Sequence, residues 1–287
     1  MVSPSRAESR LTVGLYVLAR DEAPCIEQTV AALRPLLETG VVQRFCVVDG
    51  GSTDGTPELA RAAGAEVLLA REVLPETGPV LGKGDSLWRA AAQAQEDLLC
   101  FLDADIVGDL AGIATRLIDA LRTSPRAQLV KGTFRRLTAP PGTPGAEPRP
   151  GGRITEHVVR PAFAKLLPGF SHYREPLSGQ IAIRRATLLD LPVTTGYGLE
   201  IGMLLDVVKR YGHDAVLEVP VGDIHNPPRQ DAHLQQASAQ VETTLLSRAY
   251  RYGWAQTTHR ARLHLAEKAP VERPPLSSLD AATADEA

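Results

Sequence analysis

Leu98-Leu99-Cys100-Phe101-Leu102-Asp103-Ala104-Asp105 joins an apolar run directly to two carboxylates. The apolar residues predict a short buried strand, and Asp103 and Asp105 follow at its carboxyl end. Ligands bind at that edge of an open α/β sheet, and residues at i and i+2 of an extended chain point to the same side. The two carboxylates would repel each other unless a cation or a hydroxyl-bearing ligand lies between them. Such oxygen ligands suit Mg²⁺ or Mn²⁺ together with phosphates.

A second interpretation of this stretch stays open. A strand that ends before a helix often has an acidic residue at the helix N-terminus, where the carboxylate accepts backbone N–H groups. Asp105 would then be a helix cap with no ligand.

Working outward, apolar runs and helical spacings alternate on both sides of this stretch. Strands are predicted at residues 11–18, 45–48, 66–70 and 129–133. Helices are predicted between them, one with apolar residues from Ile26 to Leu37 and one that begins at Thr56 as N-cap with Pro57 at the first helical position. This alternation predicts an α/β fold with a mainly parallel, Rossmann-like sheet flanked by helices.

Composition excludes several functional classes. The net charge of −3 creates no strong field for nucleic acid or an anionic membrane. Cys25, Cys46 and Cys100 show no paired spacing, which suits a reducing compartment. The sequence shows no signal peptide and no apolar run long enough to span a bilayer. We therefore expect a cytoplasmic protein without nucleic-acid or membrane partners.

Small and acidic residues follow the predicted strands of the first half. The turn from Asp49 to Thr56 is rich in glycine, so its backbone can approach a ligand closely, and its hydroxyl and acidic groups could contact a ribose or base. Gly82-Lys83-Gly84 would let a lysine reach a phosphate, although no Gly-rich run precedes it as in a Walker loop.

The second half offers fewer signals. Gly152, Arg153 and Thr155 open a predicted helix whose free amides could hold an anion, although Thr155 could equally serve as a helix cap. Glu200 falls in the first turn of a helix, where the dipole favours an anion. His225 follows a strand beside other polar residues, but a lone histidine is more often structural.

Four segments are predicted along the chain. They are an α/β half, a Pro/Gly linker, a second half and a disordered tail: residues 11–137, 138–152, 153–266 and 267–287.

Several motifs together resemble the GT-A nucleotide-sugar glycosyltransferases. These are Ala19-Arg20-Asp21-Glu22, Val48 to Thr56, and Asp103-Ala104-Asp105. Further motifs narrow the resemblance to the retaining glucosyl-3-phosphoglycerate synthases of actinobacteria, with the mannosyl-3-phosphoglycerate synthases as cousins: Gly82-Lys83-Gly84, Gly151 to Glu156, Pro176-Leu177-Ser178-Gly179 and Gly196 to Gly202. The resemblance spans residues 11–250. It implies that the half at residues 11–137 binds the nucleotide sugar, and that the half at residues 153–266 binds the acceptor and completes the metal site.

The resemblance implies a GT-A-like hexosyltransferase that uses a UDP- or GDP-hexose, a divalent metal ion (Mg²⁺ or Mn²⁺) and a small anionic acceptor, and it is expected to form a homodimer. Asp105 and His225 would bind the metal, and Asp103 and Glu200 would be the catalytic residues. The donor nucleotide would be bound by Ala19, Asp21, Glu22, Gly51, Ser52, Lys83 and Asp103. The acceptor would be bound by Gly152, Arg153 and Thr155.

Two residues depart from the family pattern. Gln180 stands where the family has glutamate, and Asp223 stands where it has an arginine near the metal histidine. A carboxylate in place of an arginine would repel a phosphate dianion, so a small carboxylate or a zwitterion is the rival acceptor to 3-phosphoglycerate.

Two other classes of protein are alternatives to a glycosyltransferase. A sugar nucleotidyltransferase would more commonly show a Gly-rich, basic signature right after the first strand, and residues 19–24 show none. A non-catalytic sugar-nucleotide binding protein would need neither Asp105 nor His225.

Overall fold

The structure, a computed structural model, describes residues 11–149, 152–226, 231–256 and 269–279. Its strands are β1 (Val13–Ala19), β2 (Arg44–Asp49), β3 (Glu66–Leu69), β4 (Leu98–Asp103), β5 (Val107–Gly108), β6 (Leu129–Arg136), β7 (Ile181–Arg184), β8 (Val193–Thr194), β9 (Val216–His225) and β10 (Glu272–Arg273). Its α-helices are α1 (Ile26–Glu38), α2 (Thr56–Ala62), α3 (Lys83–Gln93), α4 (Leu110–Thr123), α5 (Arg160–Leu166), α6 (Arg185–Leu189), α7 (Leu199–Tyr211) and α8 (Asp231–Arg251). A π-helical turn at Thr155–Val159 leads into α5.

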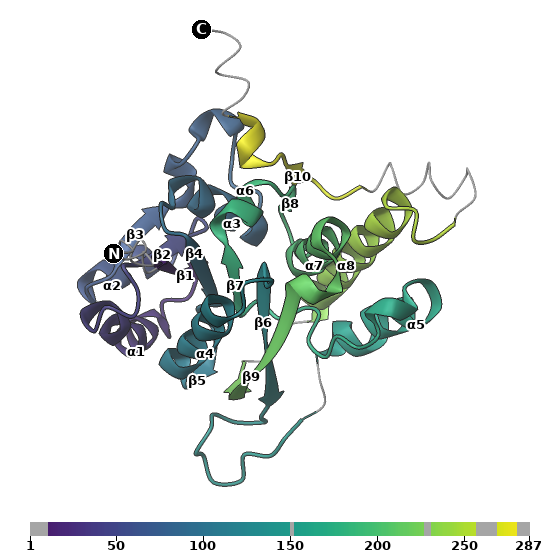
Figure 1. Cartoon of the computed structure of the whole chain (residues 1–287). Helices are drawn as coiled ribbons and strands as arrows, with labels where there is room; N and C mark the ends of the chain where they lie inside the picture. The colour runs from purple at the N-terminus through teal and green to yellow at the C-terminus, as the bar shows by residue number, and fades with distance from the viewer. Residues whose placement is uncertain (1–10, 150–151, 227–230, 257–268, 280–287) are drawn as a thin grey trace, which may run out of the picture.

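An eight-stranded sheet with the order β3-β2-β1-β4-β7-β6-β9-β5 forms the centre of the fold (Figure 1). The first four strands pair in parallel, and β6 pairs in parallel with β9. Strand β7 is antiparallel to both β4 and β6, and β5 is antiparallel to β9. All strands of this sheet except β7 and β5 therefore run in one direction, which confirms the predicted mainly parallel sheet.

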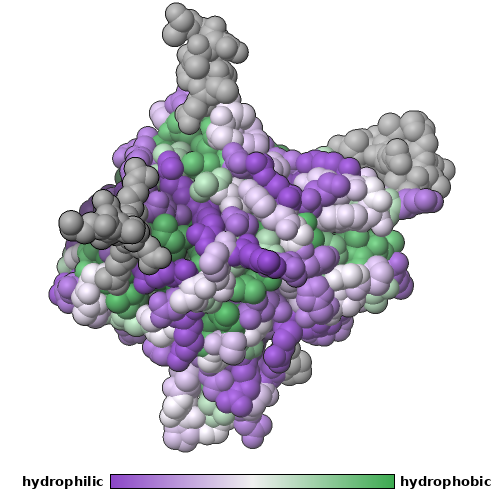
Figure 2. Space-filling view, viewed as in Figure 1, coloured by the Kyte–Doolittle hydropathy of each residue, from purple (hydrophilic) through white to green (hydrophobic). Residues whose placement is uncertain are grey.

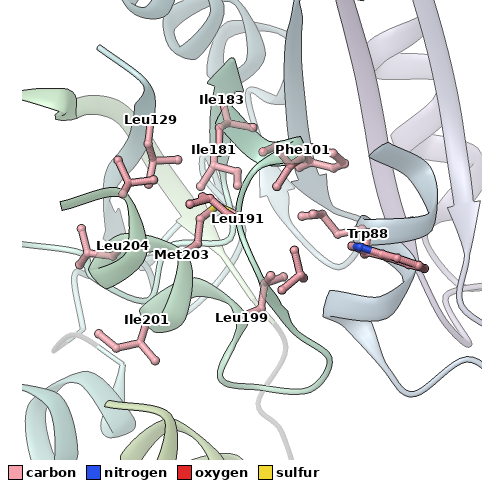
Figure 3. Packing of buried hydrophobic residues seen from close by; sticks show 14 of the residues in the cluster. Trp88, Phe101, Leu129, Ile181, Ile183, Leu191, Leu199, Ile201, Met203 and Leu204 are labelled. Carbon is pink, nitrogen blue, oxygen red and sulfur yellow. The ribbon is translucent and has the colours of Figure 1, made fainter. Parts of the chain in front are cut away.

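Helices cover both faces of the sheet because its central strands are apolar on both sides. In β1, Leu15 and Val17 pack in one buried cluster with residues of α1 and α4. The alternate residues Tyr16 and Leu18 pack in a second cluster with α3, α7 and α8. Figure 3 shows this second cluster, where Phe101 of β4 lies near Trp88 of α3. The apolar continuity of β1 thus reflects burial of both faces.

Helix starts differ in detail from the prediction. Gly55, with φ +88°, takes the N-cap position of α2, and Thr56 is its first residue. The Thr56 hydroxyl donates to Asp54 Oδ1 and accepts the backbone N–H of Glu22, so it joins two loops and does not cap. Asp109 caps α4 by accepting the Gly112 N–H at 2.9 Å, so the alternative in which Asp105 caps this helix is wrong.

The predicted disordered tail is wrong for residues 269–279. There β10 pairs antiparallel with β8, and the Trp88 indole N–H donates to the Pro274 carbonyl at 2.9 Å. Arg273 places Nε 2.7 Å and Nη2 2.8 Å from the two carboxylate oxygens of Asp85. The residues that form these contacts are far apart in the sequence, so the Pro-rich composition of the segment did not predict them.

The predicted boundary at residues 138–152 falls inside this sheet. Strand β7, from beyond the boundary, lies between β4 and β6 from before it. The two predicted halves therefore share one sheet, and their separate functions stay a prediction.

The surface carries a mixture of residue types. Figure 2 shows hydrophilic residues across the middle of the viewed face, with apolar residues on either side. In the described ranges, no helix combines the length and the apolar character that crossing a bilayer requires.

Candidate active site

Two loops interlock at the carboxyl ends of β1 and β2. The Asp21 carboxylate accepts the Thr53 N–H at 2.8 Å, and Ser52 Oγ accepts the Asp21 N–H at 2.9 Å. Asp21 adopts a φ of +56°, which is uncommon for a residue other than glycine and is tolerated best by Asp and Asn. The structure thus brings together the residues predicted to contact the nucleotide in this region: Ala19, Asp21, Glu22, Gly51 and Ser52.

Asp49 stabilises the second of these loops from inside. It is buried, and its carboxylate accepts the N–H groups of Gly51 at 3.0 Å and Ser52 at 3.1 Å. A buried carboxylate at a strand end is therefore satisfied by its own turn, which leaves the exposed side of the loop available for a ligand.

Lys83, Asp103 and Glu200 converge from three elements. Lys83 Nζ lies 2.5 Å from Asp103 Oδ1 and 2.6 Å from Glu200 Oε1. Burial alone would lower the pKa of Lys83, but the two carboxylates outweigh it and raise that pKa. Lys83 is at the start of α3 and Glu200 in the first turn of α7, so both helix N-termini face the end of β4.

Close backbone packing explains the glycines beside Lys83. A Cβ at Gly84 would lie 1.9 Å from the carbonyl oxygen of Thr194, and Gly82 has a φ of +126°. The N–H of Gly84 donates to the carbonyl of Thr195 at 2.9 Å. Glycine is therefore required for α3 to dock against the chain before α7, and this docking places Lys83 beside Glu200.

Sequence reasoning missed two polar residues beside this group. Gln180 is buried and contacts Asp103 through both ends of its side-chain amide. Lys131 of β6 is fully buried, and its Nζ donates to the Ser178 carbonyl at 3.0 Å. Burial lowers the pKa of Lys131 to about 8, and Glu200 opposes this shift. Lys131 lies within an apolar strand, and Gln180 differs from the family pattern. Neither feature indicates in the sequence that these side chains lie beside Lys83, Asp103 and Glu200.

Asp105 and His225 are brought near each other by strand pairing. Val107 of β5 is opposite His225 of β9, and Asp105 precedes Val107 by two residues. His225 Nδ1 lies 3.1 Å from the Leu137 carbonyl oxygen, which can only accept, so Nδ1 carries a hydrogen and the lone pair of the neutral imidazole is on Nε2. Within the described residues, no three His, Cys, Asp or Glu side chains form a metal-binding group. The pair fits a Mg²⁺ or Mn²⁺ ion held jointly with substrate phosphates.

Gly152 and Thr155 lie beside an arginine that the sequence did not single out. A Cβ at Gly152 would be 3.6 Å from both Arg136 Nη2 and Thr155 Oγ1. Arg136 forms a two-point ion pair with Glu175, with distances of 2.9 and 3.2 Å. Arg153 follows Gly152 and is exposed. The predicted acceptor residues thus lie in a region with two guanidinium groups.

Asp223 is paired with an arginine on the neighbouring strand. Its two oxygens accept from Arg135 Nε at 2.8 Å and Nη2 at 2.7 Å, in register across β6 and β9. The hydrogen bonds from Arg135 lower the pKa of Asp223. The charge of Asp223 is therefore compensated, and the repulsion expected from the sequence is weakened.

The sequence of this chain is similar to those of known glycosyltransferases. Residues 15–123 match the model of the family described as glycosyl transferase family 2. The glucosyl-3-phosphoglycerate synthase of Mycobacterium tuberculosis (strain CDC 1551 / Oshkosh) is 38% identical over 243 residues, which are 84% of this chain and 75% of that protein. The synthase of the same name from Petrotoga mobilis is 32% identical over 214 residues, 74% of this chain and 65% of that protein.

A solved structure gives the same result. The crystal structure of glucosyl-3-phosphoglycerate synthase from Mycobacterium tuberculosis in complex with Mn²⁺, UDP-glucose and phosphoglyceric acid matches with a TM-score of 0.79 and 34% identity, over 94% of this chain and 91% of that one. The structure of the same enzyme with Mn²⁺, UDP and glucosyl-3-phosphoglycerate matches with a TM-score of 0.79 and 32% identity, over 97% and 98%. These matches confirm the predicted GT-A-like fold.

Proposed function

Because this chain belongs to the glucosyl-3-phosphoglycerate synthase family of glycosyltransferases, we propose that it transfers glucose from UDP-glucose to 3-phosphoglycerate with the help of a divalent metal ion. The observation that carries the proposal is the convergence at one sheet edge of the interlocked loops after β1 and β2, the Lys83, Asp103 and Glu200 group, and the Asp105 and His225 pair.

Asp105 and His225 would hold the metal ion on the donor diphosphate. When bound, the ion stabilises the negative charge that develops on the leaving diphosphate. The hydrogen bond from His225 Nδ1 to the Leu137 carbonyl would hold the imidazole in place and leave Nε2 to bind the metal ion. Two protein ligands suffice because Mg²⁺-type ions commonly take their remaining ligands from phosphates and water.

Lys83, Asp103 and Glu200 would position the sugar nucleotide. Asp103 would lie against the ribose, and Glu200 against the sugar ring and the acceptor hydroxyl. Lys83 holds both carboxylates in place, because its ammonium group is within 2.6 Å of each. Rigid placement of two acceptors for sugar hydroxyl groups lowers the entropic cost of bringing donor and acceptor together.

We propose that transfer retains the configuration at the anomeric carbon. The acceptor hydroxyl oxygen would form its bond to that carbon on the face from which the diphosphate oxygen departs, and the departing diphosphate would take the hydroxyl proton. Retention, a homodimeric assembly and a cytoplasmic location stay predictions from the sequence.

The acceptor is proposed to be a phosphorylated three-carbon acid. Arg153 follows Gly152, Arg136 lies beside Gly152 in its ion pair with Glu175, and the Arg135 ion pair compensates Asp223. A small carboxylate or zwitterion remains the rival acceptor, because it needs less positive charge than a phosphate dianion.

One assay tests these assignments together. The protein is incubated with UDP-glucose, GDP-glucose, UDP-mannose or GDP-mannose, and with 3-phosphoglycerate, glycerate or serine, in the presence of Mn²⁺ or EDTA. We expect one dominant product, glucosyl-3-phosphoglycerate, from UDP-glucose with Mn²⁺ only, detected by mass spectrometry and assigned as α- or β-linked by NMR. Preferred transfer to glycerate or serine would reject the phosphorylated acceptor, and full activity in EDTA would reject the metal.

A further inference from the structure

Gln180 connects the segment before β7 to Asp103 at the end of β4. Its Nε2 donates to Asp103 Oδ2 at 2.9 Å, and its Oε1 accepts the backbone N–H of Asp103 at 3.2 Å. Gln180 is only 2% exposed. Because a carboxylate only accepts and a backbone N–H only donates, these partners define the orientation of the amide.

The two oxygens of the Asp103 carboxylate thus have different partners. Oδ1 lies 2.5 Å from Lys83 Nζ, and Oδ2 accepts from Gln180. Gly179 packs against the same pair, since a Cβ there would lie 2.4 Å from Asp103 Oδ2 and 2.6 Å from Lys83 Nζ. The carboxylate plane is therefore held on two sides and has little room to rotate.

We propose that Gln180 is the residue that positions the Asp103 carboxylate for the sugar-nucleotide donor. This inference rests on the proposed function, because Asp103 is taken as a donor-binding group. Gln180 does not itself contact the reacting atoms in this account. Strand β7 is inserted between β4 and β6, and Gln180 directly precedes it. The position of β7 therefore determines the position of the Asp103 carboxylate at the end of β4.

Gln180→Glu and Gln180→Met test the proposal, with Gln128→Glu as the matched control. Gln128 is half-buried at the opposite end of the sheet, where its Oε1 accepts from the Thr187 hydroxyl. Binding of UDP-glucose with saturating Mn²⁺ is measured by titration calorimetry, the acceptor KM by steady-state kinetics, and folding by thermal unfolding.

We expect Gln180→Met to weaken donor binding about 10- to 100-fold, as loss of a hydrogen bond to a charged group predicts. Gln180→Glu, which introduces the residue of the family pattern and keeps an acceptor for the Asp103 N–H, should weaken it less. The acceptor KM and the donor affinity of Gln128→Glu should stay near the wild-type values. A purely structural role would lower the unfolding temperature and the active fraction without changing the donor Kd.

Two results would overturn the inference, and they are distinguishable. If folded Gln180→Met binds the donor as wild type does, Gln180 does not position Asp103, and the proposed function stands. If wild type binds neither UDP-glucose nor another sugar nucleotide, both proposals fail. Should Gln180→Glu not fold, Gln180→Met decides the question, because it introduces no charge.

Discussion

The proposed donor-binding side and the proposed acceptor-binding side of this site are assembled in different ways. On the donor side, functional candidates directly follow parallel strands, as Asp21 follows β1, Ser52 follows β2 and Asp105 follows β4. On the acceptor side, side chains are placed by pairs between distant segments, such as Arg136 with Glu175 and Arg135 with Asp223. Residues that follow parallel strands meet at one sheet edge, and the order of the strands predicts this. Pairs between distant segments can be identified only in the folded structure.

The largest effect is expected on the donor side. Asp105→Ala should lower kcat about 10²- to 10³-fold, because the diphosphate loses an electrostatic stabiliser. Asp109→Ala is the control, since Asp109 caps α4 and otherwise forms an exposed ion pair with Arg116 at 3.7 Å. That control should lose about 1 kcal/mol of stability and keep its activity. Steady-state kinetics and urea unfolding of both variants distinguish the two roles, and an active Asp105→Ala would remove Asp105 from the metal site.

The second prediction concerns the place where the two sides meet. Gly179→Ala should lower kcat/KM about 10²-fold, because a Cβ would lie 2.4 Å from Asp103 Oδ2 and displace it. Gly169→Ala is the control, since the nearest atom to its Cβ would be His213 Nε2 at 3.8 Å. Equal kinetics for the two variants would show that the acceptor-side segment does not control Asp103.

The third prediction tests whether pairs between distant segments also support the donor side. Arg273→Ala should lower the free energy of unfolding by about 2 kcal/mol, because the fully buried Asp85 loses its two-point partner. Asp85 keeps contacts with Arg89 and the Leu81 N–H, which limit the loss. The control Arg61→Ala breaks an exposed pair with Glu58 and should cost less than about 1 kcal/mol. Urea unfolding measures both.

The pH dependence of this effect has a defined sign. Burial would raise the pKa of Asp85, but hydrogen bonds from Arg273 and the Leu81 N–H lower it below the ordinary value of 3.8. A carboxylate with a lowered pKa stabilises the fold above its unfolded pKa and loses that contribution as the pH falls through the folded value. The difference between wild type and Arg273→Ala should therefore be complete at neutral pH and shrink below pH ~4. A difference that grows in acid would contradict the assignment.

The smallest effect is expected on the acceptor side. Asp223→Asn should change the KM for 3-phosphoglycerate by less than about threefold, because exposed ion pairs are weak and Arg135 already compensates the carboxylate. Kinetics with 3-phosphoglycerate and glycerate provide the check. A large gain for the phosphorylated acceptor alone would restore the repulsion inferred from the sequence.

The sequence predicted the fold class, the strands of the first half and the grouping of donor residues, because each depends on local periodicity and on the edge of a parallel sheet. It did not predict the insertion of β7 between β4 and β6. Gln180, Lys131 and Arg136 were missed for the same reason, since their partners lie 39 to 77 residues away. The ordered structure of residues 269–279 was not predicted, because composition does not show which distant residues a segment contacts.

The pair between Arg273 and Asp85 has a consequence for synthesis of the protein. The two residues are 188 positions apart, and a ribosome that adds about 5–20 residues per second needs about 10–40 s to cover that distance. During this interval β1 to β4 are already available to pair, but the start of α3, which carries Lys83, lacks the arginine beneath it. The start of α3 is therefore the last part of the site to be held in place, and a nascent chain halted before Arg273 would lack the ion pair with Asp85 that supports this start.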